Sequence, residues 1–155
     1  MVIVLLRPAR PDEADLVSDL AVRSKGHWGY DARFLAVSRV QLAVLADDVV
    51  AHRVTVAEVD GVVVGFYAIE GKPPVAELSR MFIEPGHIGG GIGRRLWEHA
   101  VATAAAAGIT SFTIDSDPSA EGFYLAMGAI RSGSTPSAVV RGRVLPQLTF
   151  YVART

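Results

Sequence analysis

Residues 75–107 read VAELSRMFIEPGHIGGGIGRRLWEHAVATAAAA, and they contain three local signals in succession. Val75 to Ile83 alternates with the period of two that is typical of a β-strand. Gly86 to Gly93 then places five glycines within eight residues. Arg94 to Ala107 is rich in strong helix formers and stops at Gly108. We therefore predict a strand, a glycine-rich loop and a helix, in that order.

The glycine-rich loop calls for a physical reason, because glycine loses more conformational freedom on folding than any other residue. Backbone N–H groups at the start of a helix, together with the positive end of the helix dipole, form a concave site for phosphate or pyrophosphate. Arg94 and Arg95 add positive charge beside such a site. The alternative is a tight turn without a ligand. The position between a strand and a helix favours the anion site.

Two common phosphate-binding loops do not fit this sequence. A P-loop has lysine and then serine or threonine after its last glycine, whereas Arg94 and Arg95 follow Gly93. A dinucleotide-binding loop that began with Gly89 and Gly91 would have Arg94 in place of its third glycine or alanine. The preceding strand is also the fourth of the chain, not the first of a parallel sheet. A phosphate at this loop would therefore be held by another arrangement than these two.

The elements on either side of this stretch indicate a mixed sheet. Toward the N-terminus we predict strands over 1–6, 52–59 and 62–70, the last two joined by an Asp60-Gly61 turn, and helices over 12–23 and 32–45. Toward the C-terminus we predict strands over 109–115, 128–132 and 147–152, a helix over 118–127 and a loop over 134–146. The expected fold is α/β (α+β): one domain over 1–155, with a central twisted mixed sheet of about seven strands flanked by about four helices.

Composition excludes several classes of function. The chain has 155 residues, 15 basic and 16 acidic side chains, a net charge of −1 and no cysteine. Without cysteine there is no disulfide framework, thiolate nucleophile or sulfur-ligated zinc, and the four histidines lack helical ligand spacing, so we expect no metal. Balanced charge and short apolar runs predict no nucleic-acid partner, no membrane partner and a cytoplasmic location. Assembly as a homodimer stays open.

Two motifs in this chain resemble those of the GCN5-related N-acetyltransferase (GNAT) family. The loop is similar to the acyl-CoA-binding motif Gln/Arg-x-x-Gly-x-Gly/Ala, with Gly91 and Gly93 at the two glycine positions. Residues 117–129, DPSAEGFYLAMGA, resemble the motif Asn-x-x-Ala-x-x-Phe-Tyr-x-x-x-Gly-Phe. Ile88 stands where the family has Gln or Arg, and Asp117 stands where it has Asn.

The resemblance implies a GNAT fold, acetyl-CoA as co-substrate and an amine as acceptor. It implies that the acetyl-CoA site is made by residues of the fourth strand, the glycine loop and the second motif. These are Met81, Phe82, Ile83, Ile88, Gly89, Gly90, Gly91, Ile92, Gly93, Arg94, Asp117 and Tyr124.

Transfer of an acetyl group from a thioester to an amine needs a neutral amine, a stabilised oxyanion and a proton for the departing thiolate. The resemblance places Tyr124 at the family's general-acid position; the alternative is an aromatic that only packs on the sheet. Glu77 is the candidate general base, on the strand face that alternation gives to Met81, or else a solvated strand residue. Asp115 and Glu70 are weaker candidates for the base.

Residues 24–34, between the first two predicted helices, form a glycine-flexed aromatic stretch. The resemblance gives this region to the wall of the acceptor pocket, with Trp28 and Tyr30 as candidate substrate contacts. Both side chains are equally well explained as anchors of the loop. His27 lies in the same stretch as another candidate for the base, but a surface histidine is the simpler interpretation.

The leading hypothesis is an acetyl-CoA-dependent N-acetyltransferase, an acyltransferase that transfers acetyl to a primary amine of a small molecule or protein. Because no cysteine is available to hold the acetyl group, we expect direct transfer in a ternary complex. Two alternatives stay open. One is a non-catalytic acyl-CoA-binding sensor, and the other is an acyltransferase that uses another acyl group or an alcohol acceptor.

Overall fold

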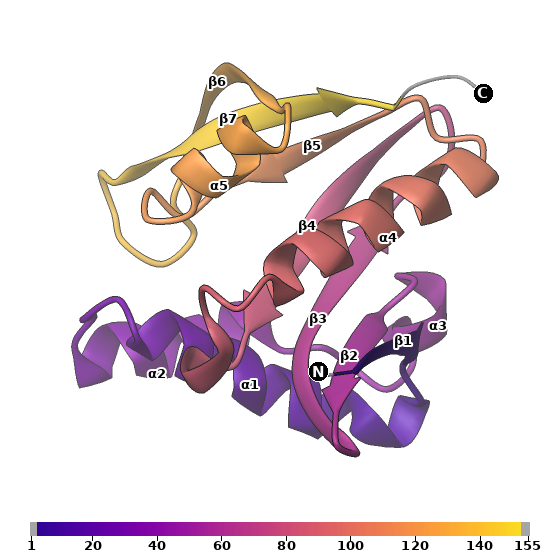
Figure 1. Cartoon of the computed structure of the whole chain (residues 1–155). Helices are drawn as coiled ribbons and strands as arrows, with labels where there is room; N and C mark the ends of the chain where they lie inside the picture. The colour runs from indigo at the N-terminus through magenta and orange to yellow at the C-terminus, as the bar shows by residue number, and fades with distance from the viewer. Residues whose placement is uncertain (1–2, 153–155) are drawn as a thin grey trace.

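A seven-stranded mixed sheet in the order β1-β2-β3-β4-β5-β7-β6 forms the centre of the computed structural model, which describes residues 3–152 (Figure 1). The strands are β1 (Val4–Pro8), β2 (Thr55–Val59), β3 (Val62–Glu70), β4 (Val75–Ile83), β5 (Ser111–Asp115), β6 (Ile130–Pro136) and β7 (Val144–Tyr151). The helices are α1 (Ala14–Gly26), α2 (Ala32–Leu42), α3 (Asp48–Ala51), α4 (Ile92–Ala106) and α5 (Glu121–Ala126), with 3-10 turns η1 (Pro11–Glu13) and η2 (Pro85–His87). Only β4 and β5 pair in parallel; the other neighbouring strands are antiparallel.

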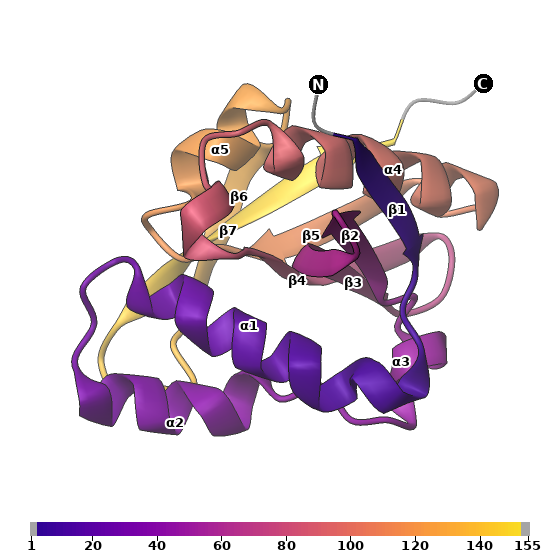
Figure 2. The same ribbon diagram turned by 60° about the horizontal axis from the view of Figure 1, so that its bottom comes forward.

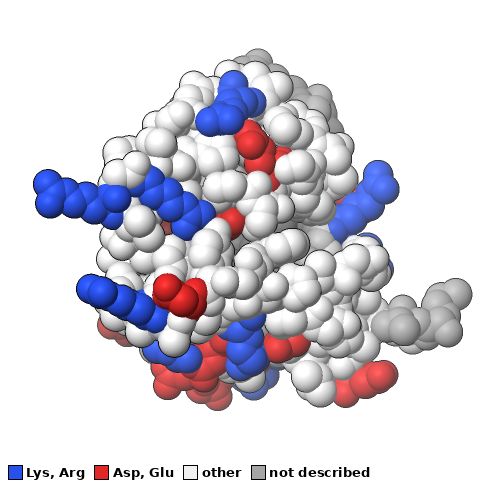
Figure 3. All heavy atoms as spheres, turned by 90° about the vertical axis from the view of Figure 1, so that its left-hand side faces the viewer, with Lys and Arg blue, Asp and Glu red and all other residues white. Residues whose placement is uncertain are grey.

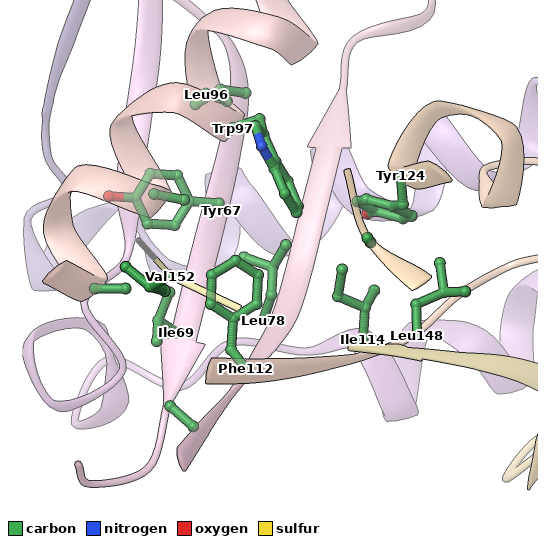
Figure 4. Packing of buried hydrophobic residues seen from close by; sticks show 14 of the residues in the cluster. Tyr67, Ile69, Leu78, Leu96, Trp97, Phe112, Ile114, Tyr124, Leu148 and Val152 are labelled. Carbon is green, nitrogen blue, oxygen red and sulfur yellow. The ribbon is translucent and has the colours of Figure 1, made fainter. Parts of the chain in front are cut away.

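Helices cover both faces of the sheet, and each face has its own apolar core. Figure 2 shows α1 and α2 on one side of the sheet and α4 and α5 on the other. Under α1, the core includes Val17, Leu20 and Phe66. Under α4 and α5, a second core is built around Trp97 and Phe112 (Figure 4). Because both faces of the sheet carry apolar side chains that must be buried, helices pack on each face and the chain forms helix, sheet and helix layers.

Strands β4 and β5 pair only at their beginnings and then diverge. Their parallel register covers Val75–Ser111 to Glu77–Thr113. Beyond this point Figure 1 shows the two strands opening away from each other. On its other edge β4 stays paired with β3 as far as Ile83. The second half of β4 therefore presents one edge of unpaired backbone toward the opening.

A β-bulge at Ser79 interrupts the alternation of β4. The register with β3 passes from Ile69–Leu78 directly to Ala68–Arg80, so Ser79 is the extra residue. Leu78 and Met81 consequently pack into the same core beneath α4. The prediction that Glu77 and Met81 share a face was wrong, because the bulge shifts the side-chain alternation by one residue. Glu77 instead faces the side of α1 and α2.

The prediction of seven strands in a mixed sheet is confirmed, whereas several boundaries differ. The short helix α3 makes five helices instead of about four, and it delays β2 to Thr55. Strands β6 and β7 extend toward each other, so the loop between them shortens to 137–143. Helix α5 begins at Glu121 because Asp117 to Ala120 forms a turn, closed by the bond from the Ala120 amide to the Asp117 carbonyl.

The first predicted strand, 1–6, is displaced to β1 (Val4–Pro8), and Met1 and Val2 lie outside the described residues. Among residues 3–152, no helix has the length and apolarity needed to cross a membrane. The same part of the chain contains no group of three or more acidic or histidine side chains arranged to hold a metal ion.

Candidate active site

The glycines in the loop before α4 and in its first turn serve two different purposes. Gly89 and Gly91 have φ of +87° and +86°, and a Cβ at either position would point into open space. Gly91 is the N-cap of α4, so the first amides of the helix have no partner within it. Gly93 is different, because a Cβ there would lie 3.0 Å from Ile83 Cδ1. Gly93 lets α4 approach β4, and Gly89 and Gly91 leave bare backbone at the surface.

A cavity of about 360 Å³ lies between this loop, β4 and α5, and we call it the loop cavity. Its lining contains most of the residues predicted for acetyl-CoA: Met81, Phe82, Ile83, Ile88, Gly89, Gly91, Gly93, Arg94 and Tyr124. Trp28, predicted as an acceptor contact, lines the loop cavity as well. The other lining residues are Ser24, Ser119, Ala120 and Phe123. Three residues predicted for this site do not line it: Gly90, Ile92, which is buried in the core, and Asp117.

The backbone of β4 presents hydrogen-bonding groups to the opening beside this cavity. The Glu84 amide donates to the Val64 carbonyl at 2.7 Å, and two residues earlier Phe82 pairs with Phe66. In an antiparallel ladder the residues that bond to the partner alternate with those that face away. The N–H and C=O groups of Met81 and Ile83 therefore point away from β3, toward the gap left by β5.

A second cavity, of about 320 Å³, lies on the opposite side of the gap, and we call it the strand-gap cavity. It is lined by charged side chains from five elements or their loops: Lys25, Glu77, Arg80, Asp115, Asp117 and Arg143. Met81, Phe82 and Tyr124 line both cavities. The two cavities therefore meet where β4 and β5 diverge.

Tyr124 lies at this junction and is almost completely buried, with 6% of its surface exposed. Figure 4 shows it extending from α5 over Ile114 and Leu148. Its ring packs at 5.8 Å from that of Trp97. Burial, reinforced by the negative charge of Asp117, raises the pKa of the Tyr124 hydroxyl. The hydroxyl consequently stays protonated at neutral pH.

Glu77 lies on the wall of the strand-gap cavity, opposite Glu70 in β3 and Thr113 in β5. Burial, followed by the negative charges of Asp115 and Glu70, raises the pKa of the Glu77 carboxyl, and Arg80 opposes this change. A raised pKa brings a carboxylate closer to the range in which it accepts a proton from an ammonium group. Of the candidate bases, only Glu77 and Asp115 line this cavity.

Asp117 connects α5 to the loop between α1 and α2. Its carboxylate accepts hydrogen bonds from the Tyr30 hydroxyl at 2.8 Å, from Lys25 Nζ at 3.1 Å, and from the amide and hydroxyl of Ser119 at 2.9 and 2.6 Å. Burial acts in the opposite direction, but these donors and the Lys25 charge lower the pKa of Asp117 to about 2. Tyr30 stacks on Phe34 at 4.1 Å and lines neither cavity, so it anchors this loop.

Replacement of Asp117 with asparagine should destabilise the fold in a pH-dependent way. The carboxyl has a pKa of about 2 in the folded protein against 3.8 ordinarily, so its contribution is complete above pH 4 and is lost as the pH falls toward 2. We expect Asp117→Asn to lower the free energy of unfolding by about 2 kcal/mol at pH 7. Urea denaturation at pH 7 and pH 3 measures this. Asp19→Asn, at an exposed ion pair with Arg39, is the control and should change little. A loss that is the same at both pH values would contradict the assignment.

Residues 34–140, which include the glycine loop, β4 and Tyr124, match the acetyltransferase (GNAT) domain family. The chain belongs to the GNAT family. This confirms the resemblance inferred from the two sequence motifs. No curated protein matches the chain by sequence.

Solved structures of GNAT proteins share this fold over nearly their whole length. A GCN5-related N-acetyltransferase of Rhodopseudomonas palustris has a TM-score of 0.80 at 21% identity, covering 95% of this chain and 94% of that one. The PaiA N-acetyltransferase of Thermoplasma acidophilum, in complex with coenzyme A, has a TM-score of 0.77 at 15% identity and coverages of 96% and 99%. YncA of Salmonella typhimurium, solved with acetyl-CoA, has a TM-score of 0.68 at 17% identity and coverages of 99% and 96%. At these identities the likeness shows the fold.

Sequence reasoning did not anticipate that Lys25, Arg80 and Arg143 line a cavity of this GNAT domain. The hydrogen bond from Arg143 to Tyr30 joins residues 113 positions apart, so no local pattern relates them. The sequence offered one indication of these cations at Asp117. A carboxylate in place of the family's asparagine needs a positively charged partner when it is buried. The structure shows that partner to be Lys25, with Arg143 nearby.

Proposed function

We propose that this GNAT protein is an acetyl-CoA-dependent N-acetyltransferase that transfers an acetyl group to a primary amine in a ternary complex. The observation that supports this proposal is the meeting of two cavities at Met81, Phe82 and Tyr124. One cavity has the bare-backbone loop, and the other has a carboxylate with a raised pKa. Two substrates that enter from opposite faces could therefore react without leaving the protein.

The loop cavity fits acetyl-CoA by its chemistry. Open space at Gly89 and Gly91 lets a pyrophosphate approach the amides at the start of α4, where the helix dipole also favours negative charge. The outward-facing groups of Met81 and Ile83 can bind the amides of a pantetheine arm. These backbone contacts do not need the Gln or Arg that Ile88 replaces. Acetyl-CoA supplies the activated acetyl thioester when it is bound.

Tyr124 is proposed as the general acid that protonates the departing thiolate. Its raised pKa keeps the proton on the hydroxyl, and its place at the junction brings it close to both substrates. Glu77 is proposed as the general base, which takes a proton from the ammonium form of the acceptor directly or through water. Glu77 and Tyr124 both line the strand-gap cavity, but Tyr124 also lines the loop cavity, so the acid borders the proposed acetyl-CoA site and the base does not.

Glu77→Gln should remove the acid limb of the pH–rate profile. A base acts in its deprotonated form, so kcat/KM should rise with pH through the raised pKa of Glu77 and then level. The glutamine variant should be slower by about 10²-fold or more, with no such rise. Glu70→Gln removes one negative charge that raises this pKa, so it should move the limb to lower pH. An unchanged limb in Glu77→Gln would remove Glu77 from the reaction.

Thermal unfolding with acetyl-CoA, CoA and longer acyl-CoAs tests the proposal at its first step. Specific binding should raise the unfolding midpoint in a saturable way by mass action. Acetyl transfer to a panel of primary amines, followed by mass spectrometry, then tests catalysis. Binding without transfer to any amine would favour a sensor, and the absence of a shift at millimolar acetyl-CoA would overturn the acyl-CoA site.

A further inference from the structure

We propose that the acceptor amine carries a carboxylate, so that the strand-gap cavity selects amino acids or similar amino-carboxylates over plain amines. This inference rests on the proposed acetyltransferase function and names the substrate class of the same site. It follows from the way charge is divided within the cavity: an unbalanced positive cluster lies at one wall and an unbalanced negative cluster at another.

The positive cluster consists of Lys25, Arg143 and Asp117. Their side chains are 14%, 22% and 15% exposed, and two cations share one carboxylate. Asp117 already accepts four hydrogen bonds, two on each oxygen. Among the described residues, no other carboxylate lies within 4 Å of Lys25 or Arg143. A net positive charge therefore remains partly buried at this wall, and a bound anion would compensate it.

Two aromatic rings fix the cations in place. The Arg143 guanidinium lies 5.1 Å from the Tyr30 ring centre and 5.4 Å from that of Phe34, and Lys25 Nζ lies 5.7 Å from each. Arg143 Nη2 also donates to the Tyr30 hydroxyl at 2.7 Å. Lys25 has one of its three ammonium donors assigned to Asp117. These contacts position both cations, and Lys25 keeps two donors for a ligand.

The negative cluster consists of Glu77 and Asp115, which line the same cavity. Asp115 accepts hydrogen bonds from Thr135 and Gln147, which are neutral. Arg80 lines the same cavity, and its hydrogen bonds go to the carbonyls of Gln41, Leu42 and Ser79, so two carboxylates share this wall with one cation. This wall therefore offers two carboxylates to a cationic ligand.

The two clusters are separate parts of one cavity. Lys25 and Arg143 contact Asp117 and Tyr30, whereas Asp115 bonds to Thr135 and Gln147, and among the described residues no ion pair joins the two clusters. Lys25 and Arg143 do not line the loop cavity, so the phosphates of CoA are not the anion that they would hold. An amine at the acidic wall and a carboxylate at the basic wall would satisfy both clusters at once.

The overall charge of the protein would not by itself attract carboxylated amines to the cavity. Figure 3 looks onto the end of the molecule at which β4 and β5 diverge, and it shows basic and acidic side chains dispersed among uncharged surface. The chain as a whole has a net charge of −1. Recognition of a carboxylate would therefore depend on contacts within the cavity.

Matched pairs of amines test this inference on the CoA-saturated protein. We would compare L-phenylalanine with 2-phenylethylamine, L-lysine with cadaverine, and β-alanine with ethylamine, by calorimetry and by saturation-transfer NMR. The member with a carboxylate should bind at least about tenfold more tightly in one or more pairs, as expected for hydrogen bonds to a charged group. Equal binding in all pairs, tighter binding of the plain amines, or no binding by any carboxylated member would overturn the inference.

Substitutions in the positive cluster test whether this cluster causes the preference for carboxylated amines. Lys25→Met and Arg143→Met should remove the preference, and Lys25→Arg should restore most of it because the charge is kept. Arg33→Met is the control, since it removes a positive charge from an exposed position of α2 outside both cavities. A preference that survives both methionine variants would overturn the inference. Acetyl-CoA titration of each variant reports folding and keeps this result distinct from the proposed function, which fails if acetyl-CoA does not bind or if no amine is acetylated.

Discussion

Tyr124→Phe should lower kcat by about 10²–10⁴-fold, the range expected when a general acid is removed. The change deletes one hydroxyl, and the ring that packs against Trp97 is kept, so the fold and acetyl-CoA affinity should be preserved. Without the proton donor, the thiolate must leave unprotonated, which raises the barrier to its departure. Steady-state kinetics with an amine that the protein acetylates, together with calorimetric titration of acetyl-CoA, separates the loss of chemistry from a loss of binding.

Tyr67→Phe is the matched control for this result. Tyr67 is also buried, and its hydroxyl bonds to His99 and Thr103 on α4, away from both cavities. Its loss should cost about 1 kcal/mol of stability and leave kcat unchanged. Equal activity in wild-type protein and Tyr124→Phe would remove Tyr124 from the mechanism and leave it as a packing residue.

Gly91→Val should abolish detectable acetyl-CoA binding. Gly91 has a φ of +86°, and a side chain there would extend into the open space that the proposed pyrophosphate needs. Valine is β-branched, so it resists this backbone conformation and would also displace the amides of the first turn of α4. We expect Kd for acetyl-CoA to rise by more than about 100-fold, because several charge-assisted hydrogen bonds are lost together.

Gly61→Val separates backbone strain from loss of the site. Gly61 lies in the turn between β2 and β3, has a φ of +78° and also has no atom near its virtual Cβ. Both variants should lose similar stability, but only Gly91→Val should lose acetyl-CoA. Tight binding by folded Gly91→Val would show that this loop is not the phosphate site.

The sequence predicted the features of the site that depend on local chemistry. The five glycines from Gly86 to Gly93 indicated that bare backbone is needed at the start of α4, and Gly89 and Gly91 have positive φ. That this backbone binds an anion stays a prediction. The position of Tyr124 followed from a motif within one helix and its preceding turn. The structure adds that Tyr124 borders both cavities, a fact about packing that a motif does not contain.

Features that depend on register or distant contacts were not predictable. A β-bulge adds one residue without a clear mark in composition, so the extra residue at Ser79 moved Glu77 away from the face of Met81. The cluster of Lys25 and Arg143 is brought together only by the fold. Asp117 was noted for its departure from the family motif, and the structure now provides cations that explain its charge.

Amide chemical shifts on titration with acetyl-CoA test most directly whether the glycine loop and the open edge of β4 hold this molecule. Saturable shifts should concentrate at Gly89, Gly91 and Gly93 and at Met81 and Ile83, and Gly61 should not move. Binding that leaves the loop amides unshifted, or shifts confined to another face of the sheet, would contradict the placement of acetyl-CoA in the loop cavity.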